Sequence, residues 1–179
     1  MGEADLLDPP ALHMELSFDF SNAYPDILLL TGTQTGNAET VAEAVAAMLD
    51  AHGFAPTVRS MMDTDMGDLD AVSQLIVITS TYGEGELPDT AHDFHAALNE
   101  TQPDLSHLAY GVIALGDSHY AHFANGGRLM DAALAGCQAL PVLPIHTIDQ
   151  GPTRAQLEEA MLWAMQCAEA FSEAFAEDE

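Results

Sequence analysis

The chain has 179 residues, 48% of them hydrophobic, which suits one domain with a sizeable core. Its 29 acidic residues face only three basic ones, all arginine, and the formal net charge at pH 7 is −26. A charge of this sign and size repels nucleic acid and anionic lipid, so it argues against both as partners.

The acidity itself has two explanations, and the sequence leaves both open. An acidic field can steer basic protein surfaces towards the chain in a salt-dependent way. Alternatively, the charge only maintains solubility, as in a salt-rich cytoplasm where the self-repulsion is screened.

The start of the chain and its cysteines indicate a cellular location. Residues 1–5 lack the basic start and apolar run of a secretory signal, and no apolar stretch approaches the length of a membrane span. Cys137 and Cys167 are too few for a disulfide framework in a chain this long, so we expect reduced thiols. We therefore expect a cytoplasmic protein with no membrane segment.

Residues 1–24 mix acidic residues, a Pro-Pro pair and scattered apolar residues without a sustained period. We expect them to form an N-terminal extension, partly disordered, ahead of a domain over residues 25–176. Within the extension Leu16, Phe18 and Phe20 alternate, which is compatible with a short strand or with an arm that packs on the domain or on a partner. Residues 177–179 should form a frayed acidic tail.

From residue 26 onward, short apolar runs alternate with helical patterns, which is typical of βαβ units in a parallel sheet. The apolar runs at 27–30 and 75–78 lack the polar alternation of a half-exposed strand, so both faces of the sheet should be covered. We predict an α/β, doubly wound, five-stranded parallel sheet with helices on both faces. The expected strands cover 27–30, 57–59, 75–80, 111–115 and 139–143, and the expected helices cover 39–53, 89–100, 127–135 and a long segment from about 153.

In an open parallel sheet, ligands bind beyond the carboxyl ends of the strands. The loop at 31–39 reads TGTQTGNAE and opens into a helix, so its hydroxyl groups and the free amides of the helix start can hold an anion. The loop lacks the lysine of a nucleotide triphosphatase loop and the third glycine of a dinucleotide motif, so a phosphomonoester held without a countercharge fits better. An ordinary helix N-cap at Thr35 or Asn37 is the structural alternative.

Two further loops each carry one tyrosine. Residues 80–89 read STYGEGELPD after the third expected strand, and residues 115–123 read LGDSHYAHF after the fourth. Taken singly, Tyr82 or Tyr120 could be a loop anchor that packs on the core. Taken together beside a phosphate site, two aromatic rings on facing loops suit a planar ring system that carries a phosphorylated chain.

These three motifs, in this order, resemble the FMN loops of the flavodoxin family, and especially of the flavodoxin-like domains of cytochrome P450 reductase and sulfite reductase. In length and order the chain is most similar to the short, stand-alone MioC-type flavodoxins, over about residues 26–172. The resemblance implies an FMN-binding carrier of single electrons. Stacked rings and nearby carboxylates, with Glu84, Glu86 and Asp117 as candidates, would disfavour additional negative charge on the flavin, so we expect a low reduction potential. The partners of the carrier would be basic redox proteins, namely an NAD(P)H-dependent reductase and an acceptor, and we expect a monomer.

The resemblance also implies roles for individual residues. Residues 33–38 would wrap the phosphate, Tyr82 and Tyr120 would flank the isoalloxazine ring, and Gly83 would lie near the flavin N5. No side chain is expected to be catalytic, because FMN itself supplies the redox chemistry. The implied FMN-binding residues are Thr33, Gln34, Thr35, Gly36, Asn37, Ala38, Ser80, Thr81, Tyr82, Gly83, Glu84, Gly85, Leu115, Gly116, Asp117, Tyr120, His122, Phe123 and Asp149.

Other functions compete with this interpretation. A flavodoxin-like NAD(P)H-dependent quinone reductase shares the fold, which does not fix the function. A metal protein would use the pairs His92 with His95 or His119 with His122, each spaced i, i+3. A binding module that has lost FMN is a further class. A response-regulator receiver is excluded because its chemistry needs a lysine, and the chain has none.

Overall fold

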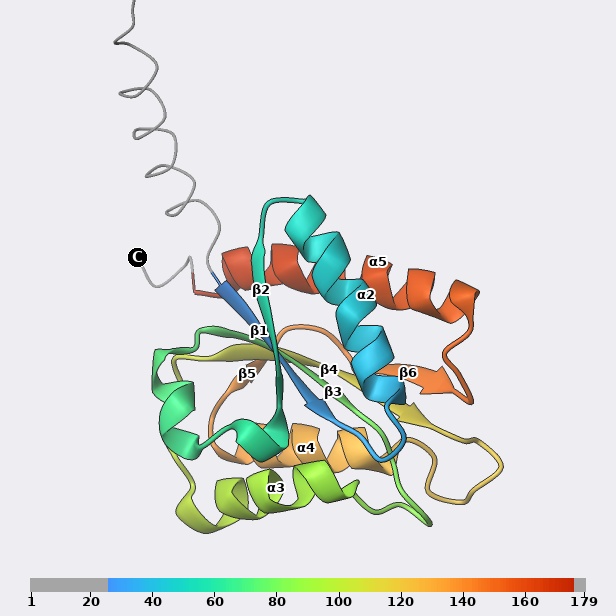
Figure 1. The fold of residues 1–179 in the computed structure, drawn as a ribbon. Helices are drawn as coiled ribbons and strands as arrows, with labels where there is room; N and C mark the ends of the chain where they lie inside the picture. Colours follow the sequence, from blue (N-terminus) through green and yellow to red (C-terminus); the bar gives the residue numbers. More distant parts are fainter. Residues whose placement is uncertain (1–25, 176–179) are drawn as a thin grey trace, which may run out of the picture.

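A six-stranded sheet forms the middle layer of the computed structural model, which describes residues 26–175 (Figure 1). The expected extension over 1–24 and the expected tail over 177–179 lie outside the described residues. All strand pairings are parallel in the order β2-β1-β3-β4, and β5 and β6 both pair with the outer edge of β4. The strands are β1 (Asp26–Gly32), β2 (Ala55–Ser60), β3 (Gln74–Thr79), β4 (Ala109–Gly116), β5 (Leu140–Pro141) and β6 (His146–Asp149).

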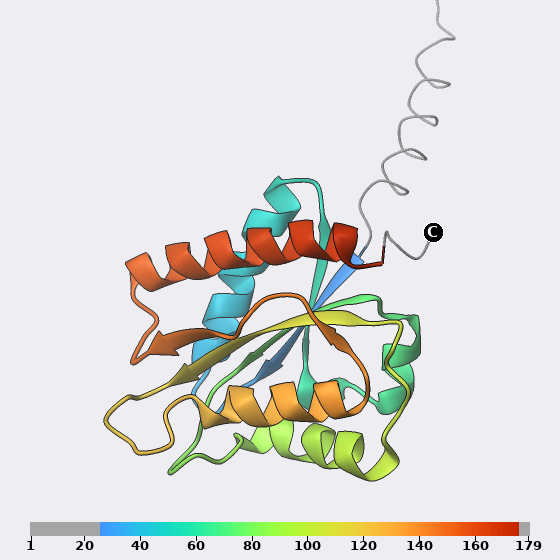
Figure 2. The same ribbon diagram turned by 180° about the vertical axis from the view of Figure 1, so that it is seen from behind.

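Helices cover both faces of this sheet, with α2 and α5 on one face and α3 and α4 on the other (Figures 1 and 2). Parallel strands need long crossover connections, and the helices on the two faces provide them. The predicted α/β, doubly wound parallel sheet is therefore confirmed. The helices are α2 (Asn37–Ala51), α3 (Asp89–Thr101), α4 (Asn125–Gly136) and α5 (Arg154–Ala174), with two short 3-10 helices after β2, η2 (Met61–Asp63) and η3 (Met66–Ala71).

The burial of β1 shows why its sequence is a continuous apolar run. Ile27 and Leu29 are fully buried in the hydrophobic cluster shared with α2 and α5. Leu28 and Leu30 are buried in the cluster shared with α3 and α4. Because successive side chains of a strand point to opposite faces, only a strand covered on both faces needs an apolar residue at every position.

The fifth strand position differs from the prediction of one strand over 139–143. Leu140–Pro141 pairs with the first half of β4, and His146–Asp149 pairs with its second half. Pro141 and Pro144 have no N–H group, so this stretch cannot maintain a continuous hydrogen-bonded ladder. The Pro144 carbonyl instead accepts a hydrogen bond from Trp163 Nε1 of α5 at 3.2 Å. Two short strands therefore replace the predicted fifth one.

The last helix begins at a capping box, close to the predicted start near residue 153. The Thr153 hydroxyl accepts a hydrogen bond from the Gln156 N–H at 3.2 Å, and the Gln156 side chain accepts one from the Thr153 N–H at 2.8 Å. These two bonds satisfy donors that a helix start leaves unpaired. In the described part of the chain, no helix is both long enough and apolar enough to cross a bilayer.

Candidate functional site

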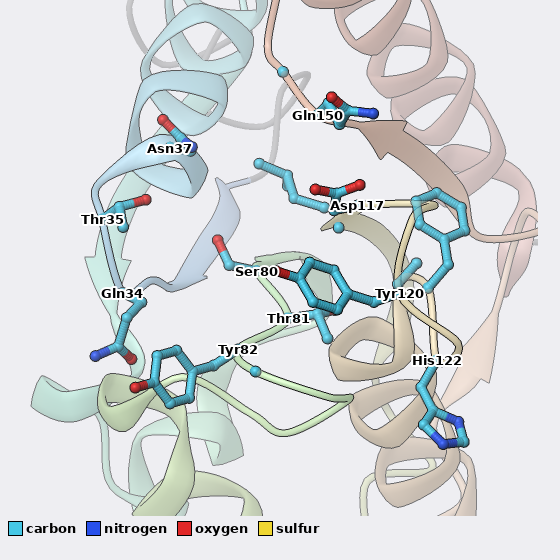
Figure 3. Close-up of a pocket in the computed structure, with 16 residues that line it drawn as sticks. Gln34, Thr35, Asn37, Ser80, Thr81, Tyr82, Asp117, Tyr120, His122 and Gln150 are labelled. Carbon is cyan, nitrogen blue, oxygen red and sulfur yellow. The ribbon is translucent and has the colours of Figure 1, made fainter.

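A pocket of about 460 Å³ opens at the carboxyl edge of the sheet, between the loops that follow β1, β3 and β4 and the turn that follows β6. Gln34, Thr35 and Asn37 approach it from the first loop, whereas Asp117 and Tyr120 approach it from the opposite side (Figure 3). The strands are parallel, so their carboxyl ends share one edge, and loops far apart in sequence meet there.

Most of the predicted site residues line this pocket. The exceptions are Thr33, Gly36, Ala38, Glu84, Gly85 and Asp149, which lie in or beside the same loops. Ala124, Gln150 and Gly151 line it without having been predicted; the signal for the last two is their place directly after a strand. The predicted residues that line the pocket are Gln34, Thr35, Asn37, Ser80, Thr81, Tyr82, Gly83, Leu115, Gly116, Asp117, Tyr120, His122 and Phe123.

The β1–α2 loop turns into its helix at Gly36, which has φ +93°, a left-handed value that favours glycine. The Gly36 N–H donates to Thr33 Oγ1 at 2.7 Å, and the first helical hydrogen bond runs from the Thr40 N–H to the Gly36 carbonyl at 3.1 Å. The N–H groups of residues 37–39 therefore precede the helical ladder at the end that carries the positive partial charge. This end of the pocket can hold an anion.

The first turn of α3 holds the same loop from its other side. The Thr90 hydroxyl accepts from the Thr33 N–H at 2.8 Å and donates to the Thr33 carbonyl at 3.1 Å. The Asp89 N–H donates to Gln34 Oε1 at 3.0 Å. Sequence reasoning missed both contacts, because they join residues more than fifty positions apart and no local pattern marks them.

The loop after β3 forms a tight turn that presents Tyr82. The Tyr82 N–H donates to the Glu86 carbonyl at 2.7 Å, and the Glu86 N–H donates back to the Tyr82 carbonyl at 2.8 Å. Within the turn Gly85 has φ +119°, and a Cβ added to it would lie 2.8 Å from the Cβ of His122. Asn125 Nδ2 donates to the Gly85 carbonyl at 2.8 Å, so the start of α4 holds this turn.

The loop after β4 presents Tyr120 and is tied to the end of β6. Asp149 Oδ1 accepts from the Ser118 N–H at 2.9 Å, and hydrogen bonds from Ser118 hold the pKa of the Asp149 carboxyl below its ordinary value. Asp117 Oδ1 accepts from the His119 N–H at 2.9 Å, and hydrogen bonds from His119 likewise lower the pKa of Asp117. Asp149 thus orders the Tyr120 loop from outside the pocket wall.

The pocket wall holds a carboxylate, that of Asp117, but no Lys or Arg side chain. Tyr82 and Tyr120 are 48% and 55% exposed, which is high for large aromatic side chains. Among residues 26–175, no three His, Cys, Asp or Glu side chains are grouped so that they could hold a metal ion.

Comparison with known proteins places these features in a family context. The model of the flavodoxin family matches residues 29–163. The structure is similar to a cysteine-to-alanine mutant of flavodoxin from Pseudomonas aeruginosa, with a TM-score of 0.74 and 30% identity over 83% of this chain and 99% of that one. It is also similar to flavodoxin 2 from Bacillus cereus, with a TM-score of 0.73 and 28% identity over 84% of this chain and 100% of that one.

Curated relatives are larger proteins. The chain is 37% identical, over 130 residues, to the sulfite reductase [NADPH] flavoprotein alpha-component of Shewanella sp. (strain MR-7). This match covers 72% of the chain and 22% of the flavoprotein. It is 40% identical, over 111 residues, to human (Homo sapiens) methionine synthase reductase, and this match covers 60% of the chain and 16% of the reductase. The chain therefore spans about a fifth of the length of the curated relatives it matches.

Proposed function

Since the chain belongs to the flavodoxin family of FMN-binding electron-transfer proteins, we propose that its carboxyl-edge pocket holds FMN and that the chain carries single electrons between a reductase and an acceptor protein. The observation that carries the proposal is the joint placement, in one pocket, of Tyr82, Tyr120 and the start of α2. Each feature alone has an ordinary structural explanation. Together they supply aromatic faces and an anion site for one ligand.

The ring end of the pocket fits a planar aromatic group. Tyr82 and Tyr120 come from the loops after β3 and β4 and reach the opening with about half of each residue exposed (Figure 3). A stacked ring would cover apolar surface that is now open to solvent, and aromatic contacts of this kind are favourable. Ser80, Thr81 and Gly83 would line the edge of the ring from the same side as Tyr82.

The other end of the pocket fits a phosphate without a countercharge. Thr35 and Asn37 offer side-chain donors beside the N–H groups at the start of α2, and no arginine or lysine lines the pocket. A phosphomonoester such as that of FMN would accept hydrogen bonds from these groups. Thr33, Gly36 and Ala38 would act here through the backbone geometry of the loop.

When bound, FMN supplies one-electron redox chemistry, and the residues around the pocket tune the reduction potential of the flavin. Asp117 lies in the pocket wall, and Glu84 and Glu86 belong to the turn that carries Gly83. Negative charge at these positions disfavours additional negative charge in the pocket, which lowers the reduction potential. We therefore propose a low-potential donor.

The strongly negative net charge of the chain indicates what kind of surface its partner proteins carry. A chain with a net charge of −26 would dock with a basic reductase and a basic acceptor, and the encounter rate should fall as salt screens the attraction. The names of the curated relatives support a reductase-linked role, since they describe a sulfite reductase flavoprotein and a methionine synthase reductase. The monomeric state and the cytoplasmic location belong to the same proposal.

Titration of FMN with the purified chain tests the cofactor. We expect quenching of flavin fluorescence that saturates at one FMN per chain, because tyrosines beside a flavin quench its emission. With NADPH and an NADPH-dependent reductase, the loaded protein should then reduce a basic acceptor such as cytochrome c, more slowly as NaCl is raised. Unquenched FMN contradicts the proposal, and steady NAD(P)H oxidation by the loaded chain alone supports a quinone reductase instead.

A further inference from the structure

Thr90 lies in the first turn of α3 and does not line the pocket, yet it makes a two-way contact with the loop that does. Its hydroxyl accepts from the Thr33 N–H at 2.8 Å and donates to the Thr33 carbonyl at 3.1 Å. One side chain therefore satisfies both backbone groups of Thr33, in the way that a neighbouring strand would.

Through Thr33, the contact with Thr90 also affects the backbone at the start of α2. The hydroxyl of Thr33 accepts the hydrogen bond of the Gly36 N–H at 2.7 Å, and Gly36 holds the left-handed turn from which the helix begins. The orientation of the N–H groups after Gly36 thus depends on where the backbone of Thr33 is held. Thr90 fixes that position from a different crossover unit of the fold.

We propose that Thr90 is a positioning residue that presets the β1–α2 loop for phosphate, and so makes the pocket select a phosphorylated flavin over an unphosphorylated one. The inference rests on the proposed FMN function and assigns the selectivity to a residue outside the pocket. Thr90 acts through Thr33 and Gly36 and has no direct contact with the ligand site.

Thr90 also links the two ends of the pocket. The turn that carries Tyr82 continues through Leu87 and Pro88, both buried, directly into Asp89 and Thr90. Asp89 adds a second bond to the phosphate-side loop, from its N–H to Gln34 Oε1 at 3.0 Å. The ring-side turn and the phosphate-side loop are therefore held in one relative position by the start of α3.

The test compares FMN with riboflavin, which lacks the phosphate, as ligands of the unliganded full chain. Dissociation constants come from quenching of flavin fluorescence for the wild type and for Thr90→Val, which keeps the shape and removes the hydroxyl. Losing hydrogen bonds that order the loop should weaken FMN binding about tenfold and riboflavin binding less than about twofold. In the unliganded protein, the Thr33 amide of Thr90→Val should exchange with solvent about tenfold faster.

Three further variants make the test specific. Thr90→Ser keeps the hydroxyl and should restore the wild-type preference for FMN, and Thr90→Ala repeats the test where valine would crowd the half-buried site. Thr101→Val is the matched control. The Thr101 hydroxyl donates a hydrogen bond to the Ala97 carbonyl at 2.8 Å, and Thr101 is the last residue of α3, at the opposite end of the helix from Thr90. The control should leave both dissociation constants unchanged.

The outcomes separate this inference from the proposed function. If the wild type binds FMN, but Thr90→Val retains the wild-type ratio of riboflavin to FMN dissociation constants, the positioning role of Thr90 is wrong and the FMN function stands. Equal weakening of both flavins would likewise overturn the role in phosphate selection. If the wild type binds neither flavin, the FMN function itself fails, and the inference fails with it.

Discussion

Tyr120 has more than half of its surface exposed, although a large aromatic side chain usually finds cover within a folded protein. We predict that Tyr120→Ala weakens FMN binding by about twofold to twelvefold, because an aromatic contact contributes about 0.5–1.5 kcal/mol. Flavin fluorescence quenching measures the change. Leu162→Ala removes a comparably exposed side chain from α5 and should leave FMN binding unaltered. Equal affinities of the Tyr120→Ala variant and the wild type would contradict the stacking role.

Asp149 illustrates how a residue beside the pocket can matter without entering it. Its carboxylate accepts the Ser118 N–H at 2.9 Å, and hydrogen bonds from Ser118 lower its pKa from 3.8. A pKa that is lower in the folded state means that the carboxylate stabilises the fold fully above pH 3.8, and that this contribution is lost as the pH falls through the folded value.

We therefore predict that Asp149→Asn lowers the melting temperature at pH 7, and that its difference from the wild type shrinks as the pH falls below about 3.8, where the wild-type carboxyl also becomes neutral. Thermal unfolding followed by circular dichroism over a pH series measures this. Asp70→Asn removes the same charge from an exposed site in η3 and controls for relief of the net acidity. A deficit that persists unchanged at low pH would show that the carboxylate charge is not responsible.

At the scale of elements, the contact between α5 and β4 depends on a glycine. A Cβ added to Gly111 of β4 would lie 2.6 Å from Cys167 Sγ and 2.7 Å from Trp163 Cη2, closer than real Cβ contacts. We predict that Gly111→Ala lowers the free energy of unfolding by about 1–3 kcal/mol, because the helix must shift away from the sheet. Urea unfolding monitored by Trp163 fluorescence measures the loss.

A matched substitution separates this packing effect from the general effect of replacing glycine. A Cβ added to Gly136, the last residue of α4, would meet nothing within 4 Å. Gly136→Ala should therefore be neutral or slightly stabilising, and Gly111→Ala combined with Cys167→Ala should recover part of the lost stability. Equal unfolding midpoints for Gly111→Ala and the wild type would show that α5 can shift away from the sheet without lowering the free energy of unfolding.

At the scale of the whole molecule, the net charge of −26 sets how the fold responds to salt. The three arginines are each engaged locally: Arg59 with Asp68 at 3.7 Å, Arg154 with Glu158 at 3.8 Å, and Arg128 with the Phe123 carbonyl at 2.6 Å. Most carboxylates therefore repel one another, which opposes compact folding until salt screens the repulsion.

We predict that raising NaCl from 10 to 300 mM (about 30 and 6 Å of Debye length) raises the melting temperature at pH 7. Each kcal/mol of relieved repulsion should contribute about 2–4 °C in a chain of this size. The same salt series near the isoelectric point of about 4.1 is the control, since the net charge there approaches zero and the salt effect should vanish. A melting temperature independent of salt at pH 7 would show that the acidic groups are too far apart to oppose folding.

Local patterns in the sequence determined the class of the fold and the position of the candidate site. Continuous apolar runs such as 27–30 require cover on both faces, and polar, glycine-containing loops directly after such runs mark the carboxyl edge of a parallel sheet. These inferences need only neighbouring residues and the geometry of strands. They extend to the family, because the three loop motifs are themselves local.

Only the tertiary structure decided how those loops are held and where the sheet ends. Thr90 meets Thr33 across 57 positions, and Asn125 meets Gly85 across 40, so no periodicity could pair them. The replacement of one predicted fifth strand by β5 and β6 likewise involves a distant contact, since the Pro144 carbonyl that lies between them accepts a hydrogen bond from Trp163 of α5. A backbone or side-chain hydrogen bond between distant segments is satisfied only once the sheet has brought them together, and that is why the sequence could not specify these contacts.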